Sequence, residues 1–178
     1  MPPRTTAPSQ VIQGTVVFTD IVGFTEYTAL RGDESAMDLL STQERLVRDT
    51  LPPDARIVKE LGDGLLLWFD DACAAIETSL RLQERFERES MDSDVPLWVR
   101  CGMHSGQQTR RGEDLIGHDV NIAARVVDVA GPGEVLLSNA TLDRVEGKLP
   151  DVWFDELGPV VMKGIPDPVR LYRASAVG

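Results

Sequence analysis

The sequence is poor in cysteine and lacks long apolar runs. Its two cysteines, Cys73 and Cys101, lie in apolar contexts without C-x-x-C spacing, which excludes a disulfide-rich scaffold and predicts buried, reduced thiols in a cytoplasmic protein. No apolar stretch approaches the ~18 residues that a membrane-spanning helix requires, so no membrane segment is expected. Basic residues are also in deficit, with 18 Lys and Arg against 29 Asp and Glu and a net charge of −11. That charge repels nucleic acid, so no nucleic-acid partner is expected, and an anionic substrate would need a locally basic pocket.

The 178 residues and 42% hydrophobic content suit a single domain with a sizeable core. Residues 1–10 are rich in Pro and Thr and contain no apolar segment typical of a signal peptide. They are therefore expected to form a disordered leader. The domain itself is expected to span residues 11–178.

Apolar periodicity predicts an alternating series of strands and helices. The expected strands cover residues 13–19, 55–61, 65–69, 97–104, 134–138, 152–156 and 169–173. The expected helices begin near residues 25, 71, 119 and 139, and residues 89–94 are expected to form a polar loop. This order predicts an α/β (α+β) fold with a ferredoxin-like βαββαβ core and a C-terminal αβ extension.

Two carboxylates stand out because each follows or joins apolar strand-like runs. Asp20 ends the run TVVFT, and Asp63 lies in the turn Gly62-Asp63-Gly64 between two such runs. An acidic side chain at the tip of a buried strand is costly unless something pairs with it. Two carboxylates beside glycine-containing turns, with most ligand positions open, are typical of Mg²⁺ held against phosphates. The sequence therefore predicts a divalent-cation site at Asp20 and Asp63.

Several other polar residues have spacings that suit a nucleotide site, although each has a simpler interpretation. Lys59 precedes Asp63 by four residues, so it could form an ion pair with Asp63 or donate to a ligand base. Asn121 and Arg125 lie at i and i+4 of an expected helix, where they could bind phosphoryl oxygens or form a surface pair. Lys163 lies in a loop that contains Gly164, Pro166 and Pro168. It could bind a phosphate or be a solvated lysine.

Together these segments resemble the catalytic domain of the class III nucleotidyl cyclases. The resemblance rests on residues 18–25 (FTDIVGFT), 59–64 (KELGDG) and 117–125 (GHDVNIAAR) in this order, and it covers about residues 13–174. The compact stretch before the last segment is more similar to bacterial adenylate cyclases than to animal ones. The resemblance implies a ferredoxin-like domain that catalyses as a homodimer, with each site assembled across the interface.

The resemblance implies a phosphate-binding half of the site. Asp20 and Asp63 would hold two Mg²⁺ or Mn²⁺ ions, with the carbonyl of Ile21 as a further ligand. The turn formed by Gly23, Phe24 and Thr25 precedes a helix, so its backbone N–H groups suit the same phosphates.

The resemblance also implies a nucleoside-binding half. Lys59 and Asp114 would read adenine, Asn121 would orient the ribose, Arg125 would stabilise the transition state, and Lys163 would contact the β- and γ-phosphates. Asp114 is placed only by its spacing from Asn121, so a solvated loop acid, beside the equally acidic Glu113, is the alternative.

The expected reaction is ATP to 3′,5′-cyclic AMP and pyrophosphate. An ammonium that donates to adenine N1 and a carboxylate that accepts from N6 match adenine, whereas guanine in the same orientation reverses donor and acceptor. The alternatives are a guanylate or relaxed-specificity cyclase and a catalytically silent nucleotide-binding regulatory domain. A diguanylate cyclase is disfavoured because the sequence has no Gly-Gly-acidic-acidic-Phe hairpin.

The histidines and tryptophans are expected to be structural. His104 is expected at a strand end and His118 in a turn before a helix. Trp68, Trp98 and Trp153 are expected in core or interface packing.

Overall fold

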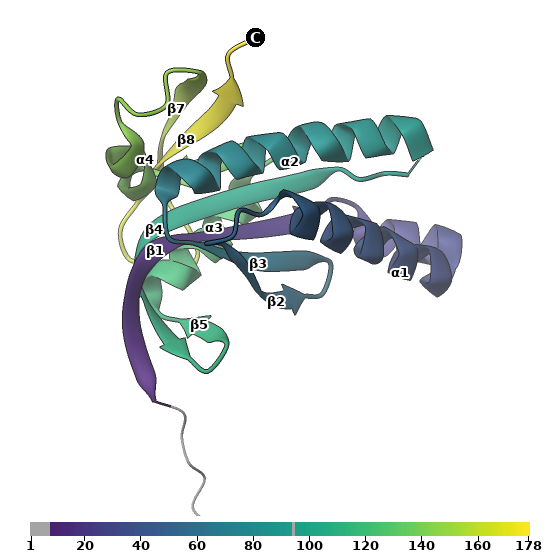
Figure 1. The fold of residues 1–178 in the computed structure, drawn as a ribbon, viewed down its shortest axis with the longest axis horizontal. Helices are drawn as coiled ribbons and strands as arrows, with labels where there is room; N and C mark the ends of the chain where they lie inside the picture. Colours follow the sequence, from purple (N-terminus) through teal and green to yellow (C-terminus); the bar gives the residue numbers. More distant parts are fainter. Residues whose placement is uncertain (1–7, 94) are drawn as a thin grey trace, which may run out of the picture.

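The computed structural model describes residues 8–93 and 95–178 as a mixed sheet covered by helices (Figure 1). Its elements in chain order are β1 (Ser9–Ile21), α1 (Phe24–Thr50), β2 (Arg56–Leu61), β3 (Gly64–Phe69), α2 (Ala72–Ser93), β4 (Val99–Arg111), β5 (Asp114–Ile116), α3 (His118–Val129), β6 (Val135–Ser138), α4 (Asn139–Val145), β7 (Val152–Val160) and β8 (Val169–Ala176). None of the helices in this part of the chain combines the length and apolarity that crossing a bilayer requires.

The sheet has the strand order β2-β3-β1-β4-β6-β8-β7, and β5 pairs with β4. β1 lies between β3 and β4 and is antiparallel to both, whereas β4 and β6 are parallel. The order β2-β3-β1-β4, with α1 and α2 as the connecting helices, is the ferredoxin-like βαββαβ core that the sequence predicted. The elements after β4 form the predicted C-terminal extension.

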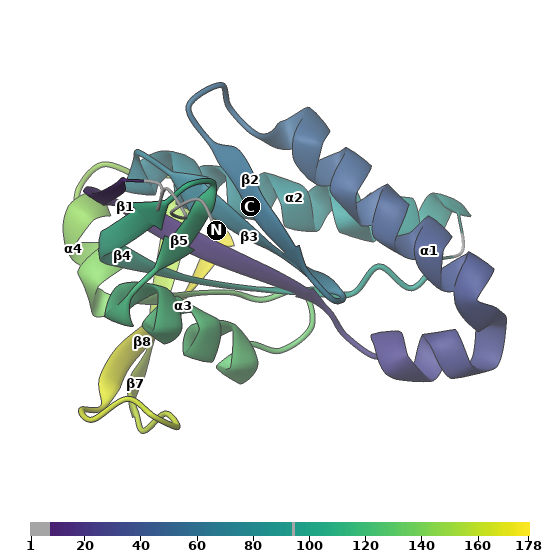
Figure 2. The same ribbon diagram turned by 90° about the horizontal axis from the view of Figure 1, so that it is seen from below.

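The two faces of the sheet carry separate hydrophobic cores. Side chains alternate along β1, so that Val17 packs with α1 and α2, whereas Val16 packs with Val120 and Ala123 of α3. Figure 2 shows the result, with α1 and α2 on one side of the sheet and α3 on the other. Strands β1 and β3 are therefore packed between helices on both faces, which fixes the ends of these strands in space.

One glycine changes the expected shape of the first helix. Gly32 lies inside α1 with φ of 86°, outside helical geometry, so α1 consists of two helical pieces. The first piece carries Phe24 and Thr25 and follows directly from the end of β1.

Several predicted boundaries were wrong, and backbone hydrogen bonding explains why. β1 begins at Ser9 instead of residue 13, and β4 extends to Arg111, because the two strands pair along their whole lengths from Ser9–Arg111 to Ile21–Val99. Residues 9 and 10 therefore belong to the sheet and not to a leader, and residues 1–7 of that predicted leader lie outside the described residues. Such polar strand ends are held by the ladder and not by an apolar pattern.

The predicted loop at residues 89–94 was also wrong, because α2 continues through Ser93. Its polar side chains bond within the helix: Ser90 Oγ donates to the carbonyl of Phe86 (2.8 Å), and Ser93 Oγ donates to Glu89 (3.1 Å). The polar residues that suggested a loop therefore satisfy their hydrogen bonds inside the helix.

The cysteine and tryptophan side chains agree with their predictions only in part. Both cysteines are free, and Cys101 is fully buried, which raises the pKa of its thiol to about 12, whereas Cys73 is only half-buried. Trp68 packs against the core on the α3 side. Trp98 and Trp153 are 49% and 64% exposed, so they are not core residues.

Candidate active site

The structure brings Asp20 and Asp63 together at one end of the central strand. Asp20 pairs with Gly64 in the β1–β3 ladder, and the N–H of Ile21 donates to the carbonyl of Asp63 (3.2 Å). At Gly64 an added Cβ would lie 2.1 Å from the carbonyl oxygen of Thr19, so only glycine allows this approach. The predicted pair of carboxylates is thus fixed by backbone contacts between the two strands.

The two carboxylates interact strongly. Burial, together with the neighbouring Asp20 carboxylate, raises the pKa of Asp63 to about 6. A divalent cation would favour the ionised form of both groups, so the carboxylates fit Mg²⁺ or Mn²⁺. Within residues 8–93 and 95–178, no group of three or more His, Cys, Asp or Glu side chains is placed to hold a metal ion. Further ligands would therefore come from backbone carbonyls, water or a substrate phosphate.

Arg100 is a neighbour of this pair that the sequence reasoning missed. It lies opposite Asp20 in the β1–β4 ladder and forms an ion pair with it. Its Nε is buried without a hydrogen-bond partner among the described residues. A charged residue between Val99 and Cys101 of an apolar strand is costly without a partner. This position could therefore have indicated a charged neighbour of Arg100 from the sequence alone. Arg100 therefore offsets one of the two carboxylate charges at this end of the sheet.

The predicted phosphate-binding turn lies beside the carboxylates. Gly23, with φ of 72°, precedes α1 and allows the chain to turn from β1 into the helix. A cavity of about 620 Å³ opens here. It is lined by Phe24, Thr25, Thr28, Asp33, Ala36, Met37, Leu40, Gly62 and Asp63. The turn, the start of α1 and Asp63 therefore share one hollow.

Lys59 and Asp114 form an ion pair, with 2.9 Å between Lys59 Nζ and Asp114 Oδ1. Lys59 therefore pairs with Asp114 and not with Asp63. The side chains are 40% and 44% exposed, so a ligand can reach them. The hydrogen bond from Lys59 holds the pKa of Asp114 below its ordinary value, which keeps an acceptor next to a donor.

The remaining predicted residues lie on α3 and in the β7–β8 connection. Arg125 is half-buried and pairs with Asp128 on the same helix (3.3 Å), while Asn121 is exposed. Lys163 is exposed beside Gly164. Within the described part of the chain, no hydrogen bond or ion pair links Asn121 or Lys163 to the other predicted site residues.

The two histidines differ from their predicted positions in one respect. His118 is exposed at the start of α3, whereas His104 is buried inside β4 and not at a strand end. Burial lowers the pKa of His104, although the hydrogen bond to Asp119 acts in the opposite direction.

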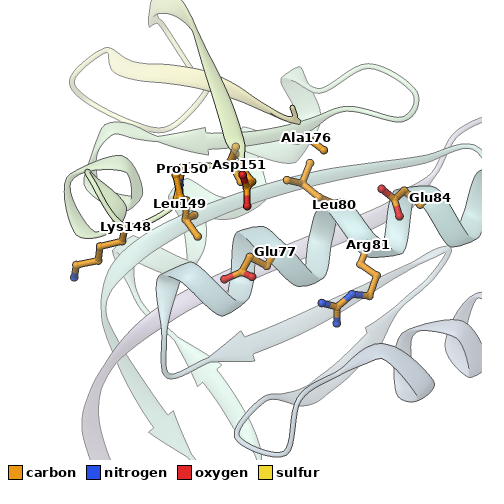
Figure 3. A pocket seen from close by; sticks show the side chains of 10 residues that line it. Glu77, Leu80, Arg81, Glu84, Lys148, Leu149, Pro150, Asp151 and Ala176 are labelled. Carbon is orange, nitrogen blue, oxygen red and sulfur yellow. The ribbon is translucent and has the colours of Figure 1, made fainter. Parts of the chain in front are cut away.

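A second hollow lies away from all of these residues. A groove of about 320 Å³ runs between α2 and the segment from Lys148 to Val152. Figure 3 shows acidic and basic side chains on both of its sides, including Glu77, Arg81 and Lys148. None of the predicted site residues lines it, so the groove is not part of the candidate site.

Comparison with known families decides the class of the domain. Residues 7–175 match the family model described as the adenylate and guanylate cyclase catalytic domain. The chain belongs to this family. Among related proteins, the pH-sensitive adenylate cyclase MT1302 of Mycobacterium tuberculosis is 33% identical over 164 residues, which is 90% of this chain and 40% of that protein. An adenylate cyclase of Streptomyces griseus is 37% identical over 126 residues, 70% of this chain and 31% of that protein. The chain thus spans less than half the length of these relatives.

Solved structures confirm the cyclase fold. The adenylyl cyclase CyaB from P. aeruginosa superposes with a TM-score of 0.83 at 25% identity, covering 94% of this chain and 95% of that chain. An adenylate cyclase from Trypanosoma brucei, described in its monomeric state, has a TM-score of 0.79 at 25% identity, over 93% of this chain and 88% of that chain.

The pKa of Asp63 generates a prediction about stability in metal-free buffer. Because this pKa is raised, the folded cyclase domain binds the Asp63 proton more tightly than the unfolded chain. Stability from this group is therefore present at low pH and is lost as the pH rises from about 4 to about 6. Urea unfolding in EDTA should show Asp63→Asn gaining stability relative to wild type as the pH rises from 4.5 to 7. Asp70→Asn, at an exposed position after β3, should show a constant difference. A constant difference for Asp63→Asn as well would contradict the raised pKa.

Proposed function

We propose that this domain is an adenylate cyclase that converts ATP to 3′,5′-cyclic AMP and pyrophosphate. The observation that carries the proposal is the 2.9 Å pair of Lys59 and Asp114 in a chain that also holds Asp20 and Asp63 together. The family of the domain and the names of its M. tuberculosis and S. griseus relatives support the same activity. The regulatory and silent-domain alternatives have no comparable support, since both carboxylates and Arg125 are present.

The Lys59–Asp114 pair gives the proposal its base preference. The Lys59 ammonium would donate to adenine N1, and the Asp114 carboxylate would accept from the N6 amino group. Guanine in the same orientation presents an acceptor at position 6 and a donor at N1, which leaves both protein groups mismatched. ATP is therefore the proposed substrate.

In the proposed reaction, the ribose 3′-oxygen attacks the α-phosphorus while the bond to the bridging oxygen of pyrophosphate breaks, and the 3′-hydroxyl proton is released. Asp20, Asp63 and the carbonyl of Ile21 would hold two Mg²⁺ or Mn²⁺ ions. When bound, these ions would lower the pKa of the 3′-hydroxyl and neutralise the leaving phosphates.

The protein's own groups would orient the substrate and stabilise charge. Asn121 would hold the ribose, and Arg125 would stabilise charge on the transferring phosphoryl group. Arg125 would exchange its present partner, Asp128, for the substrate. Lys163 and the N–H groups of the Gly23–Thr25 turn would contact the β- and γ-phosphates. Arg100, at Asp20, would add positive charge at the same end.

We also propose that two copies of the chain assemble each site. Asn121 and Lys163 are exposed and unconnected to the other predicted site residues in the described structure. Large apolar side chains that are exposed on one chain would be stabilised by burial against a second copy. Four such side chains lie within four residues of a predicted site residue: Leu61, Ile116, Val129 and Val161.

We further propose that the protein is cytoplasmic. The free thiols of Cys73 and Cys101 support this location.

Product identification tests the activity. Purified protein incubated with ATP and Mn²⁺ should produce cyclic AMP, resolved by chromatography. Asp20→Ala should remove the product, because the cations lose a carboxylate ligand, whereas Asp70→Ala should retain it. Absence of cyclic nucleotide from either ATP or GTP, with folded dimer present, would contradict the proposal and favour a silent nucleotide-binding domain.

Reversing the base-reading pair tests the substrate. Lys59→Glu with Asp114→Lys keeps an ion pair but exchanges donor and acceptor, so it becomes complementary to guanine. The ratio of kcat/KM for GTP over ATP should rise by about 10- to 100-fold, the effect of one or two unmet buried hydrogen bonds. Each single variant serves as a control for loss of the ion pair. An unchanged ratio in the double variant would show that these two residues do not read the base.

A further inference from the structure

The first turn of α3 is fastened to β4 by a single carboxylate. Asp119 Oδ1 lies 3.0 Å from His104 Nε2, and Asp119 Oδ2 accepts a hydrogen bond from the backbone N–H of Gln107 (2.8 Å). Both partners belong to β4, whereas Asp119 is the second residue of α3. The residue before α3 is Gly117, which has no side chain with which to cap the helix. The carboxylate therefore links the start of the helix to the strand beneath it.

Two glycines of β4 allow α3 to lie directly on the strand. A Cβ at Gly106 would lie 2.1 Å from Asp119 Oδ2, and a Cβ at Gly102 would lie 2.3 Å from the backbone nitrogen of Val127. Alternate residues of a strand share one face. Gly102, His104 and Gly106 therefore face α3 together, with the histidine between two points of close backbone approach. This contact leaves the helix little freedom to shift.

The second ring nitrogen of His104 contacts the neighbouring strand β6. The residue is 7% exposed, and its Nδ1 lies 2.6 Å from Ser138 Oγ on β6. Because the ionised Asp119 can only accept, Nε2 carries the proton, and Nδ1 accepts from the Ser138 hydroxyl. The neutral ring thus satisfies both neighbours, and the proposed cyclase chemistry does not use it.

We infer that Asp119, held by His104 and Gln107, is the clamp that positions Asn121 and Arg125 for the reaction. Asn121 follows Asp119 by two residues and Arg125 by six, on one continuous helix. A shift or rotation at the first turn is therefore transmitted to both side chains. Asp119 and His104 are positioning residues in this account, which rests on the proposed cyclase function.

Kinetics of three variants and one control variant test the clamp. His104→Ala and Asp119→Ala should lower kcat by about 10- to 100-fold, the usual cost of displacing catalytic groups by about 1 Å, with less than about a threefold change in KM for ATP. Asp119→Asn should restore most of kcat, since its oxygen can accept from Gln107 and its amide can donate to the other tautomer of His104. His118→Ala, at the exposed neighbouring histidine, should leave both constants unchanged. Equal losses in Asp119→Asn and Asp119→Ala, or a raised KM with kcat unchanged, would overturn the inference.

Hydrogen exchange of the α3 amides provides a readout that does not need activity. In folded protein, Asp119→Ala should speed exchange over residues 119–125, while Asp119→Asn and His118→Ala should not. If wild type forms no cyclic nucleotide, the proposed function fails, but this exchange pattern still tests the clamp. Unchanged exchange and unchanged kcat in Asp119→Ala would overturn it. If His104→Ala does not fold, the two Asp119 variants decide the question alone.

Discussion

The site depends on two like charges held together at the end of β1. The N–H of Ile21 donates to the carbonyl of Asp63, and Gly64 lies close against Thr19. These backbone contacts hold the Asp63 turn next to Asp20. Partial burial, together with the repulsion between the two carboxylates, raises the pKa of Asp63, and Arg100 balances only one of the charges. A site of this kind attracts divalent cations and, through them, phosphates. The turn that is proposed to bind phosphates, and the start of α1, lie around this point.

The residues proposed to read the base and to hold the sugar are organised differently. Lys59 lies level with Leu66 and Phe18, two residues along the ladder from the row that holds Asp20 and Gly64, and it forms its own ion pair with Asp114. Asn121 and Arg125 depend on α3, whose seat on β4 requires glycine at positions 102 and 106. The proposed cyclase therefore combines two rigidly held carboxylates with a helix whose exact placement decides how well its side chains contact the substrate.

Local patterns predicted the βαββαβ core, the Asp63 hairpin and the carboxylates, because turn residues and apolar runs specify these directly. The extra length of β1 and β4 was not predictable from polarity, since their ends are held by the backbone ladder. Arg100 and the His104–Asp119 contact depend on the pairing of β1 with β4 and on the packing of α3. No local spacing encodes those long-range contacts. Trp98 and Trp153 are exposed, which excludes the core alternative of their prediction, whereas the interface alternative stays a prediction.

In the proposed dimer, each site would take its metal carboxylates from one chain and its arginine from the other, and mixing two inactive variants tests this arrangement directly. Asp20→Ala and Arg125→Ala should each be inactive alone. Their mixture should regain up to about one quarter of the wild-type rate, because half of randomly mixed dimers are heterodimers with one intact site of two. If the mixture stays inactive although heterodimers are detected by native mass spectrometry, the two residues do not meet across an interface, and the shared-site account is wrong.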